Sequence, residues 1–384
     1  MKYFIVAGES SGDLYGARLI RSLKQLDPQA KFLFVGGDRM AEAAGTAPLV
    51  HCEEIAVMGI VAVLARFQAI ASAGRKMQEG LLSFAPDRIV AIDSSGFNFR
   101  YLLPFAKKHF PQVPLLYYIV PKLWAWGKSR IKTLRRYCTA LLVIFPFEEQ
   151  FFQSEGIPTS FVGNPSVEVL GKYLNSYKNQ SLQQDFVARN KRIPTSKPLI
   201  ALLPGSRKQE IKENLPLMLR TVAHYYPHYT PVIARAKGRK AEEYSQYIQM
   251  YPKAFLLADD TYALLASAEM AIVTSGTATL ETALIGTPQV VCYRFKPLRI
   301  VNWLYSKVIH TPFFSLVNII AGHKVVEELL AADATEKKLF EALEKLPSRA
   351  SILQEEYREI RLKLAGDQAS VRAADSIIQA GYSE

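Results

Sequence analysis

Short, continuous apolar runs alternate along this chain with stretches of helical periodicity, and the alternation occurs twice. The first set of predicted strands is Lys2–Ala7, Phe32–Val35, Arg88–Ile92, Leu115–Val120 and Ala140–Phe145. The second set is Pro198–Leu203, Val232–Ala236, Phe255–Leu257, Met270–Val273 and Gln289–Tyr293. Strands that are apolar on both faces and separated by helices indicate parallel sheets covered on both sides. The sequence therefore predicts an α/β protein of two doubly wound, Rossmann-like domains, with ligands bound in a cleft between them, beyond the carboxyl ends of the strands.

Proline residues and a polar stretch separate the two halves. Pro146, Pro158 and Pro165 interrupt the end of the first half, and residues 171–197 contain no strong apolar run. We therefore predict an N-terminal domain over residues 1–170 and a C-terminal domain over residues 171–349. The tail that follows is charged and helical, and two alternatives remain for it. The helices of residues 350–384 pack back on the first domain, or they are exchanged between the subunits of a homodimer.

The charge of the chain indicates an anionic partner. It has 47 Lys and Arg residues against 35 Asp and Glu, a net charge of +12, which favours nucleic acid, acidic lipid or a phosphorylated substrate. Hydrophobic residues make up 49%, which excludes a disordered chain. Three widely spaced cysteines argue against a disulfide framework and fit the cytoplasm. No apolar run is long enough for a transmembrane helix, so we expect a soluble protein or one on a membrane surface.

One glycine-containing loop follows the first strand of each half. Gly8–Asp13 reads GESSGD, and its glycines permit a tight turn and close approach to a ligand. Glu9 and Asp13 suggest recognition of hydroxyl groups; the alternative is a simple turn capped by Ser or Asp. Leu203–Lys208 combines a glycine, a serine and two cations, which makes a phosphate site plausible.

The strongest loop is Thr274–Glu281, which follows a predicted strand and begins a helix. Its glycine and small hydroxyl residues expose backbone N–H groups at the positive end of that helix, an arrangement that suits a diphosphate. A carboxylate at Glu281, about one and a half turns later, can accept two hydrogen bonds from a ribose. The alternative is a Thr or Ser N-cap with a glutamate favoured by the helix dipole.

A candidate general base stands at the end of the third strand. Asp93 follows Arg88–Ile92 and precedes small residues, so it either faces the cleft as a base or caps the next helix. No metal site is predicted, because Pro227 breaks the helix that would align His224 with His228. We expect no cofactor.

Val57–Met77 is too apolar for an ordinary surface helix. It is either a buried core helix or a helix that dips into a lipid surface with cations at the headgroups. A second stretch around Trp124 and Trp126 is basic and aromatic, and it is either a solvated face or a surface for headgroups or bases. On the membrane interpretation the residues in contact with acyl chains are Ile60, Val63, Leu64, Phe67, Trp124 and Trp126.

Short motifs in a fixed order resemble those of lipid-A-disaccharide synthases, bacterial glycosyltransferases of the two-domain GT-B type (family GT19). The motifs are AGESSGDLYGA (7–17), AVMGIVAVL (56–64), ID (92–93), KLWAW (122–126), FPFE (145–148), FVGNP (161–165), LLPGSR (202–207), SGTATLETAL (275–284), YRFKP (293–297) and SLVNIIAG (315–322). They span most of the chain. Residues 171–197 carry little of the resemblance.

The resemblance implies an inverting reaction. UDP-2,3-diacylglucosamine donates its sugar to 2,3-diacylglucosamine 1-phosphate (lipid X), which gives the β-1,6 lipid A disaccharide 1-phosphate and UDP. It also implies a place on the cytoplasmic face of the inner membrane as a peripheral protein, anionic lipid as a partner and no role for nucleic acid. Asp93 matches the family's proposed base. The expected substrate-binding residues are Glu9, Ser11, Arg294 and Asn318, and the expected UDP-binding residues are Gly205, Ser206, Arg207, Ser275, Gly276, Thr277 and Glu281.

One departure from the family pattern concerns the segment after Asp93. The family continues with Ala-Pro-Asp-Phe-Asn, whereas this chain has Ser94-Ser95-Gly96-Phe97-Asn98. Gly96 thus replaces a second acid and leaves Asp93 as the single candidate carboxylate. The rival hypotheses are another GT-B UDP-sugar transferase, a UDP-sugar 2-epimerase, and a non-enzymatic protein that binds lipid or nucleic acid.

Overall fold

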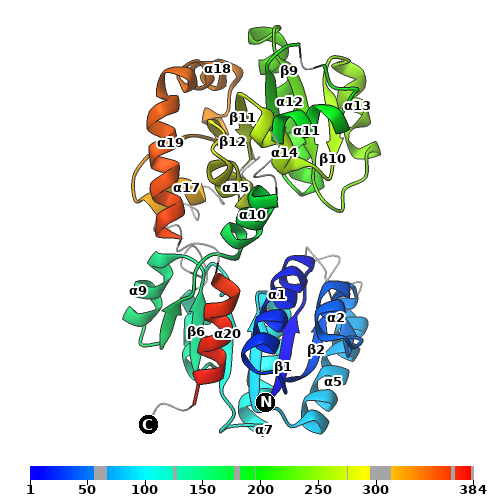
Figure 1. The fold of residues 1–384 in the computed structure, drawn as a ribbon, viewed down its shortest axis with the longest axis vertical. Coiled ribbons are helices and arrows are strands. Elements are labelled where there is room, and N and C mark those ends of the chain that lie inside the picture. The colour runs from blue at the N-terminus through cyan, green and yellow to red at the C-terminus, as the bar shows by residue number, and fades with distance from the viewer. Residues whose placement is uncertain are drawn as a thin grey trace. The chain divides into compact units, whose positions relative to one another are not determined.

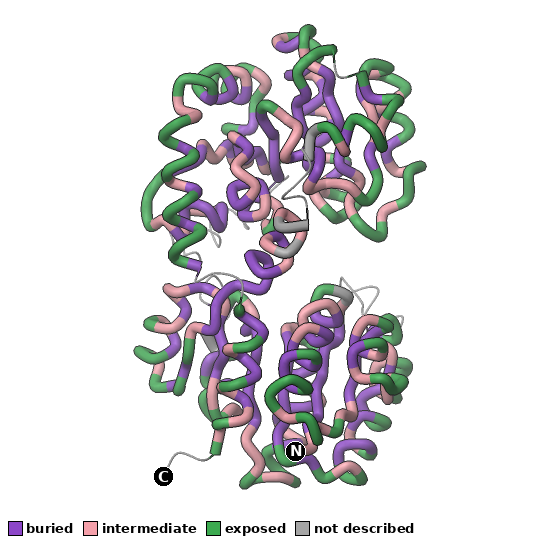
Figure 2. Tube along the Cα trace, viewed as in Figure 1, coloured by how far each residue is buried: buried purple, intermediate pink, exposed green. Residues whose placement is uncertain are grey.

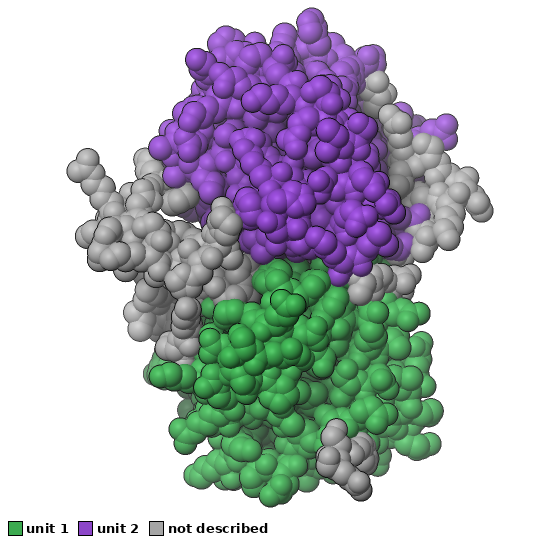
Figure 3. Space-filling model, turned by 90° about the vertical axis from the view of Figure 1, so that its left-hand side faces the viewer, with its two compact units in different colours: residues 1–168, 364–384 green, residues 169–363 purple. Residues whose placement is uncertain are grey.

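The computed structural model describes residues 1–55, 67–123, 128–176, 182–194, 196–274, 276–294, 313–364 and 368–381. The chain divides into two compact units (Figures 1 and 3). Unit 1 comprises Met1–Glu168 with Leu364–Glu384, and unit 2 comprises Val169–Lys363. Each contains one parallel sheet with helices around it. The predicted α/β class with two doubly wound domains is confirmed.

Unit 1 is built on a seven-stranded parallel sheet with the order β3-β2-β1-β4-β5-β6-β7. Its strands are β1 (Lys2–Ala7), β2 (Lys31–Gly36), β3 (Val50–His51), β4 (Arg88–Ile92), β5 (Leu115–Tyr118), β6 (Ala140–Val143) and β7 (Thr159–Phe161). Its helices are α1 (Ser10–Leu26), α2 (Asp38–Ala44), α3 (Cys52–Ile55), α5 (Phe67–Phe84), α6 (Ser95–Phe97), α7 (Leu103–His109), α8 (Lys128–Tyr137), α9 (Pro146–Ser154) and α20 (Ala369–Gln379), with a π-helical turn at Asn98–Leu102. The strand order reverses between β1 and β4, which places a topological switch point at their carboxyl ends.

The alternation of side chains along β1 divides the core of unit 1 into two layers. Tyr3 and Ile5 pack with α1, α2 and α20 on one face of the sheet, and Phe4 and Val6 pack with α5, α7, α8 and α9 on the other. In Figure 2 the strands are accordingly buried between helices that are exposed on their outer sides. Because both faces of the sheet are covered, the ends of the strands are where unit 1 can present functional side chains.

Unit 2 contains a six-stranded parallel sheet with the order β10-β9-β8-β11-β12-β13. Its strands are β8 (Leu199–Leu203), β9 (Thr230–Arg235), β10 (Phe255–Ala258), β11 (Met270–Val273), β12 (Gln289–Tyr293) and β13 (Glu327–Leu330). Its helices are α11 (Leu182–Arg189), α12 (Lys208–Tyr225), α13 (Glu242–Met250), α14 (Thr261–Ser267), α15 (Thr277–Ile285), α17 (Leu316–Ala321), α18 (Glu336–Glu344) and α19 (Leu346–Lys363), with a 3₁₀ turn at Ala331–Asp333. The switch point lies between β8 and β11, where two of the predicted loops begin.

The connection between the units and the C-terminal tail differ in their boundaries from the prediction. Helix α10 (Pro165–Ser176) is continuous across the boundary at Glu168 and Val169. Helix α19 belongs to unit 2, so the tail returns to unit 1 at residue 364 and not at 350. There α20 is held by the buried Arg88, whose guanidinium donates to the backbone oxygens of Ile377 and Ile378 at 3.0 and 3.1 Å. In this structure α20 packs on unit 1 of its own chain.

None of the described helices is both long enough and apolar enough to cross a bilayer.

Candidate functional site

In unit 1 the loops after β1 and β4 come close to each other at the switch point. A Cβ on Gly8 would lie 2.5 Å from Ser94 Oγ and 3.0 Å from Ser94 Cβ, so only glycine permits this approach. Ser94 is buried, and its Oγ has no hydrogen-bond partner within the described part of the chain. Buried hydroxyls are normally paired. The Gly8 and Ser94 loops therefore leave a polar group at the place where the fold rule puts a ligand.

The backbone at Asp93 is strained, and neighbouring side chains hold it in place. Asp93 and Ser94 both have a φ of +45°, a left-handed conformation that costs a non-glycine residue about 1–2 kcal/mol. The carbonyl oxygen of Asp93 accepts hydrogen bonds from Tyr117 Oη and, at 2.9 Å, from Asn98 Nδ2. Such over-determined strain is typical of functional sites, and here the two hydrogen bonds hold the backbone that carries the Asp93 side chain.

The carboxyl group of Asp93 is partly desolvated and has a cation near it. Burial raises its pKa above the ordinary range, and a backbone hydrogen bond from Ser94 and the charge of Lys122 oppose that rise. Lys122 follows β5 by four residues. Desolvation lowers the pKa of its ammonium group, while the charges of Glu148 and Asp93 raise it. A carboxylate whose pKa moves toward neutral is suited to accept a proton from a hydroxyl group.

The sequence analysis did not identify Lys122 as part of the site. Asp93, Lys122 and Glu148 follow β4, β5 and β6, which are neighbours in the sheet. Glu148 is buried and accepts hydrogen bonds from the backbone N–H groups of Ile144 and Phe145 at 3.3 and 3.2 Å. The order of the strands brings these charges together, and no local spacing in the sequence predicts it.

The two acidic residues of the GESSGD loop have different surroundings. Asp13 is buried, and its carboxylate accepts backbone hydrogen bonds from Gly37, Arg39 and Met40 at 2.8, 3.3 and 3.0 Å. It therefore caps the start of α2, and the suggestion that it recognises a hydroxyl group is wrong. Glu9 is half-buried and Ser11 is exposed at the start of α1. Their assignment to substrate binding stays a prediction.

In unit 2 the start of α12 already holds an anionic group. The carboxylate of Glu210 accepts hydrogen bonds from the backbone N–H groups of Ser206 and Arg207 at 2.9 and 3.1 Å, and from Arg207 Nη1 at 2.6 Å. Gly205 has a φ of +107°, and a Cβ there would lie 2.6 Å from Glu210 Cβ. The N–H groups of the loop predicted to bind phosphate are thus already hydrogen-bonded to Glu210. A phosphate would have to displace that carboxylate.

The start of α15 is arranged differently. Its first turn contains no acid, and no side chain of the described residues caps it. Gly276 has a φ of +128°, and a Cβ there would meet no described atom within 4 Å, so none of the described residues fills the space beside it. Thr274 is buried, yet its Oγ1 finds no hydrogen-bond partner within the described part of unit 2. The α15 loop therefore satisfies the requirements for an anion site better than the α12 loop does. Ser275 lies outside the described residues.

Glu281 lies in α15 and faces α14. Its Oε1 accepts a hydrogen bond from Tyr262 Oη at 2.9 Å. Burial raises the pKa of Glu281, and the hydrogen bond from Tyr262 opposes this rise. Tyr262, which the sequence analysis missed, packs edge-on against Tyr173 of α10, with ring centroids 5.3 Å apart.

The structure gives Asn318 a role in the fold. The side chain is fully buried. Its Oδ1 accepts from the backbone N–H groups of Val325 and Val326 at 2.8 and 2.9 Å, and its Nδ2 donates to Val326 O and Glu328 Oε1 at 2.9 and 2.8 Å. These bonds join α17 to the start of β13, so the amide has no group left for a substrate, contrary to the prediction. Arg294 is exposed, and its backbone N–H donates to Asn214 Oδ1 at 2.6 Å.

Six residues were predicted to contact acyl chains, and Phe67 is the one among them that lies within the described residues. It begins α5 with 43% of its surface exposed, and the guanidinium of Arg100 lies 5.2 Å from its ring centroid. This is the amphipathic combination that membrane surfaces favour. Ile60, Val63, Leu64, Trp124 and Trp126 lie outside the described residues.

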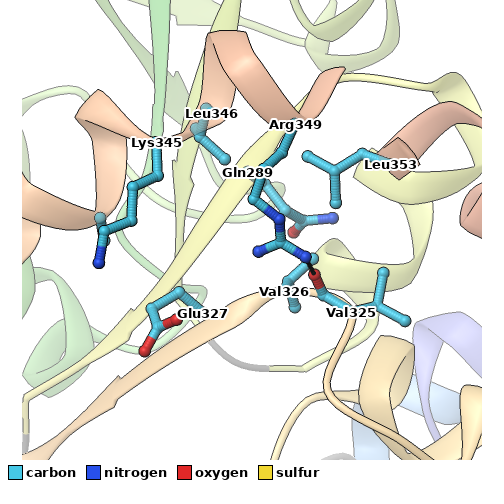
Figure 4. Close-up of a pocket in the computed structure, with 9 residues that line it drawn as sticks. Gln289, Val325, Val326, Glu327, Lys345, Leu346, Arg349 and Leu353 are labelled. Carbon is cyan, nitrogen blue, oxygen red and sulfur yellow. Dashed lines mark hydrogen bonds between the residues drawn. The ribbon is translucent and has the colours of Figure 1, made fainter. Parts of the chain in front are cut away.

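The pocket in Figure 4 lies away from these loops. It has a volume of about 10 Å³, room for about one water, and is lined by Gln289, Val325, Val326, Glu327, Ala342, Lys345, Leu346, Arg349 and Leu353. Its lining includes Gln289 and Glu327, the first residues of β12 and β13, so it lies at the amino ends of these strands. Within the described ranges, no three His, Cys, Asp or Glu side chains are grouped to hold a metal.

Comparison with known proteins decides between the functional hypotheses. The family model described as lipid-A-disaccharide synthetase matches residues 3–380. The chain belongs to this family. The lipid-A-disaccharide synthase of Trichlorobacter lovleyi is 34% identical over 98% of this chain and 97% of its own length. The enzyme of the same name from Coxiella burnetii strain Dugway is 34% identical over 91% and 90%, and that of Geobacter sulfurreducens is 33% identical over 88% and 85%.

Solved structures support the fold. The UDP-GlcNAc 2-epimerase of Neisseria meningitidis, bound to UDP-GlcNAc, has a TM-score of 0.66 at 14% identity and covers 99% of this chain and 100% of its own. A putative UDP-N-acetylglucosamine 2-epimerase of Listeria monocytogenes has a TM-score of 0.67 at 13% identity, over 99% and 96%. At such identities the likeness concerns the fold alone. The prediction of a glycosyltransferase of lipid A biosynthesis is confirmed by the family, and the rival hypotheses are not favoured.

Proposed function

We propose that this member of the family transfers 2,3-diacylglucosamine from UDP to the 6-hydroxyl of 2,3-diacylglucosamine 1-phosphate, with inversion at C1. The carboxylate of Asp93 accepts the hydroxyl proton while the new C1–O6 bond forms. The bond from C1 to the UDP oxygen breaks, and UDP leaves with the electron pair. The observation that supports this proposal most directly is the strained, partly desolvated Asp93 at the switch point of unit 1, with its raised pKa.

UDP is assigned to unit 2. The leaving diphosphate needs its growing negative charge stabilised, and preorganised backbone N–H groups achieve this without reorganisation. The start of α15 supports the assignment, because no described atom fills the space beside Gly276 and Thr277 begins a helix without an acid in its first turn. Glu281 is assigned to the two ribose hydroxyls. In this proposal Gly205, Ser206 and Arg207 contribute only after Glu210 releases them.

The reaction is tested by following UDP release from UDP-diacylglucosamine with and without lipid X, and by NMR of the new anomeric proton. We expect release that depends on lipid X and a large, β-type coupling at the new linkage. Release that is independent of any acceptor would indicate hydrolysis or epimerisation. An α linkage would exclude a single displacement with Asp93 as the base.

The membrane association is proposed on the exposed Phe67 and on two arginines that each lie over an aromatic ring. Arg100 lies over the ring of Phe67, and Arg130 lies 5.6 Å from the ring centroid of Phe99. Together with the net charge of +12, they favour peripheral binding to the anionic cytoplasmic leaflet of the inner membrane.

Co-sedimentation with vesicles that contain anionic lipid tests this association. Phe67→Asp should reduce binding, and Leu82→Asp is the matched control, because Leu82 lies on the same helix with 47% of its surface exposed. Equal binding of the two variants would contradict the proposal.

A further inference from the structure

The Glu281 carboxylate has one partner that the proposed reaction does not use. Tyr262, the second residue of α14, donates its phenol proton to Glu281 Oε1 at 2.9 Å. Helix α14 follows β10 at the edge of the sheet, and helix α15, which carries Glu281, follows β11. Two helices that follow different strands thus join their side chains beside the α15 loop.

We propose that Tyr262 is a positioning residue for nucleotide binding: it holds the Glu281 carboxylate in one orientation and leaves Oε2 to accept the ribose hydroxyls. The inference deepens the proposed function and rests on it, because it assumes that Glu281 binds the ribose of UDP. A carboxylate oxygen has two acceptor sites. One hydrogen bond at Oε1 therefore fixes the group without exhausting its capacity.

The hydrogen bond also favours the ionised form of Glu281. Burial raises the pKa of this carboxyl group, and the Tyr262 bond acts in the opposite direction. A protonated Glu281 would lose acceptor capacity toward the ribose. Without the phenol, the pKa of Glu281 rises further, and a larger fraction of the protein carries the protonated acid near neutral pH.

Other charged groups near α15 do not take over this role. The elements packed on α15 are β11, β12, α14, α17 and α19. Strand β11 and helix α17 carry no ionisable side chain, and α14 carries Tyr262 alone. Strand β12 carries Cys292 and Tyr293. Helix α19 carries eight ionisable side chains, of which Arg361 donates to the backbone oxygen of Leu284 near the end of α15; the others are Arg349, Glu355, Glu356, Tyr357, Arg358, Glu359 and Lys363. The structure gives no charge acting on Glu281 within the described residues.

The ring of Tyr262 is held independently of its hydroxyl group. Tyr173 of α10 packs against it edge-on, with the ring planes at 70°. Tyr262→Phe therefore keeps the aromatic contact with Tyr173 and removes the hydroxyl group that donates to Glu281. Tyr229→Phe is the matched control. Tyr229 Oη donates to Glu269 Oε1 at the same 2.9 Å, but Glu269 precedes β11 and so lies at the amino end of that strand, away from the α15 loop.

The experiment is calorimetric titration of UDP and 2′-deoxy-UDP into the full-length protein between pH 5.5 and pH 8.5. Wild type and Tyr229→Phe should bind UDP alike and prefer it to 2′-deoxy-UDP. Tyr262→Phe should bind UDP about tenfold more weakly at pH 6.5, the size of one hydrogen bond to a charged group. It should approach wild type at pH 8.5, because its Glu281 titrates at a higher pH.

Glu281→Gln distinguishes a failure of the proposed nucleotide site from a failure of the role proposed for Tyr262. If wild type does not bind UDP, or Glu281→Gln binds UDP and 2′-deoxy-UDP as wild type does, the proposed nucleotide site fails. If Glu281→Gln loses the preference but Tyr262→Phe behaves as wild type at every pH, the inference about Tyr262 is overturned and the site stands. A loss in Tyr262→Phe that is equal for both ligands and independent of pH would indicate a merely structural role and would also overturn it.

Discussion

Glu168 joins the returning C-terminal helix to unit 1 and forms a partly buried ion pair with Arg18, so its replacement should have an effect of measurable size. Glu168, with 2% of its surface exposed, accepts a hydrogen bond from Arg18 Nη1 at 2.9 Å. It also accepts from Ser370 N and Ser370 Oγ at 3.0 and 2.9 Å, and Ser22 Oγ donates to Ser370 Oγ at 3.2 Å. One carboxylate thus joins α1, α10 and α20. Glu168→Gln keeps the shape of this residue but removes the charge that compensates Arg18.

The expected cost follows from the burial of Glu168 and the partial exposure of Arg18, whose side chain keeps 16% of its surface exposed. Removal of one partner of a buried ion pair costs about 3–5 kcal/mol, and the isosteric glutamine should fall at the lower end. For a unit of this size, each kcal/mol lowers Tm by about 2–4 °C, so we expect a fall of about 6–12 °C. The control is Glu42→Gln. Glu42 pairs with Arg21 of the same helix α1 at 3.5 Å with 77% of its side-chain surface exposed, and it should cost under about 1 kcal/mol.

The pH dependence of stability gives a second readout. Burial raises the pKa of Glu168, but the hydrogen bonds from Ser370 and the charge of Arg18 outweigh it and lower the pKa below the ordinary 4.5. A lowered pKa in the folded state contributes stability that is present above pH 4.5 and is lost as pH falls through the folded value. Thermal unfolding followed by circular dichroism should show the gap between wild type and Glu168→Gln narrowing from pH 7 to pH 3.5. Equal Tm shifts for the two variants, or a constant gap, would refute the reasoning.

Three further predictions concern the candidate site. Lys122→Met removes a charge that lowers the pKa of Asp93, so the acidic limb of the kcat/KM profile should move to higher pH; an unmoved limb would exclude this coupling. Gly276→Ala should cost about 1–3 kcal/mol of backbone strain and weaken UDP binding in titrations, whereas Gly238→Ala, also at positive φ with open space, should leave UDP affinity unchanged. Asn318→Ala should lower Tm, because it leaves buried backbone N–H groups unpaired at about 1–3 kcal/mol each. Its KM for the UDP-sugar should stay within twofold of wild type. A large rise in KM with normal Tm would indicate that Asn318 contacts the substrate after all.

The central strands and the edge strand β10 could be predicted from the sequence, and the edge strands β3, β7 and β13 could not. Strands such as β1 and β11 are continuous apolar runs because both of their faces are covered. Strands β3 and β7 have two and three residues, too few for a pattern, and β13 begins with Glu327 and Glu328 because an edge strand tolerates charge. Local sequence therefore predicts the interior of each sheet, and it predicts an edge strand only where that strand is as apolar as β10.

The loops of the site could be predicted from the sequence, but the side chains that contact them could not. Glycines at strand ends identified the starts of α12 and α15, and only the structure shows that Glu210 fills the first of them. The spacing of residues gives no information on Lys122 or Tyr262, since strand order brings them to Asp93 and Glu281. For Asn318 the family motif marked an important residue, and its buried hydrogen bonds explain that importance through the fold.

The assignment of Asp93 as the base is tested most directly by one pair of variants measured in two assays. Asp93→Asn should lower lipid-X-dependent UDP release about 10²–10⁴-fold, the usual contribution of a general base, while its affinity for UDP stays within twofold of wild type. Asp87→Asn is the control, because Asp87 precedes the same strand at its amino end, where it accepts a hydrogen bond from the backbone N–H of Lys2 at 2.7 Å; it should change neither quantity. Turnover by Asp93→Asn near the wild-type rate would contradict the account.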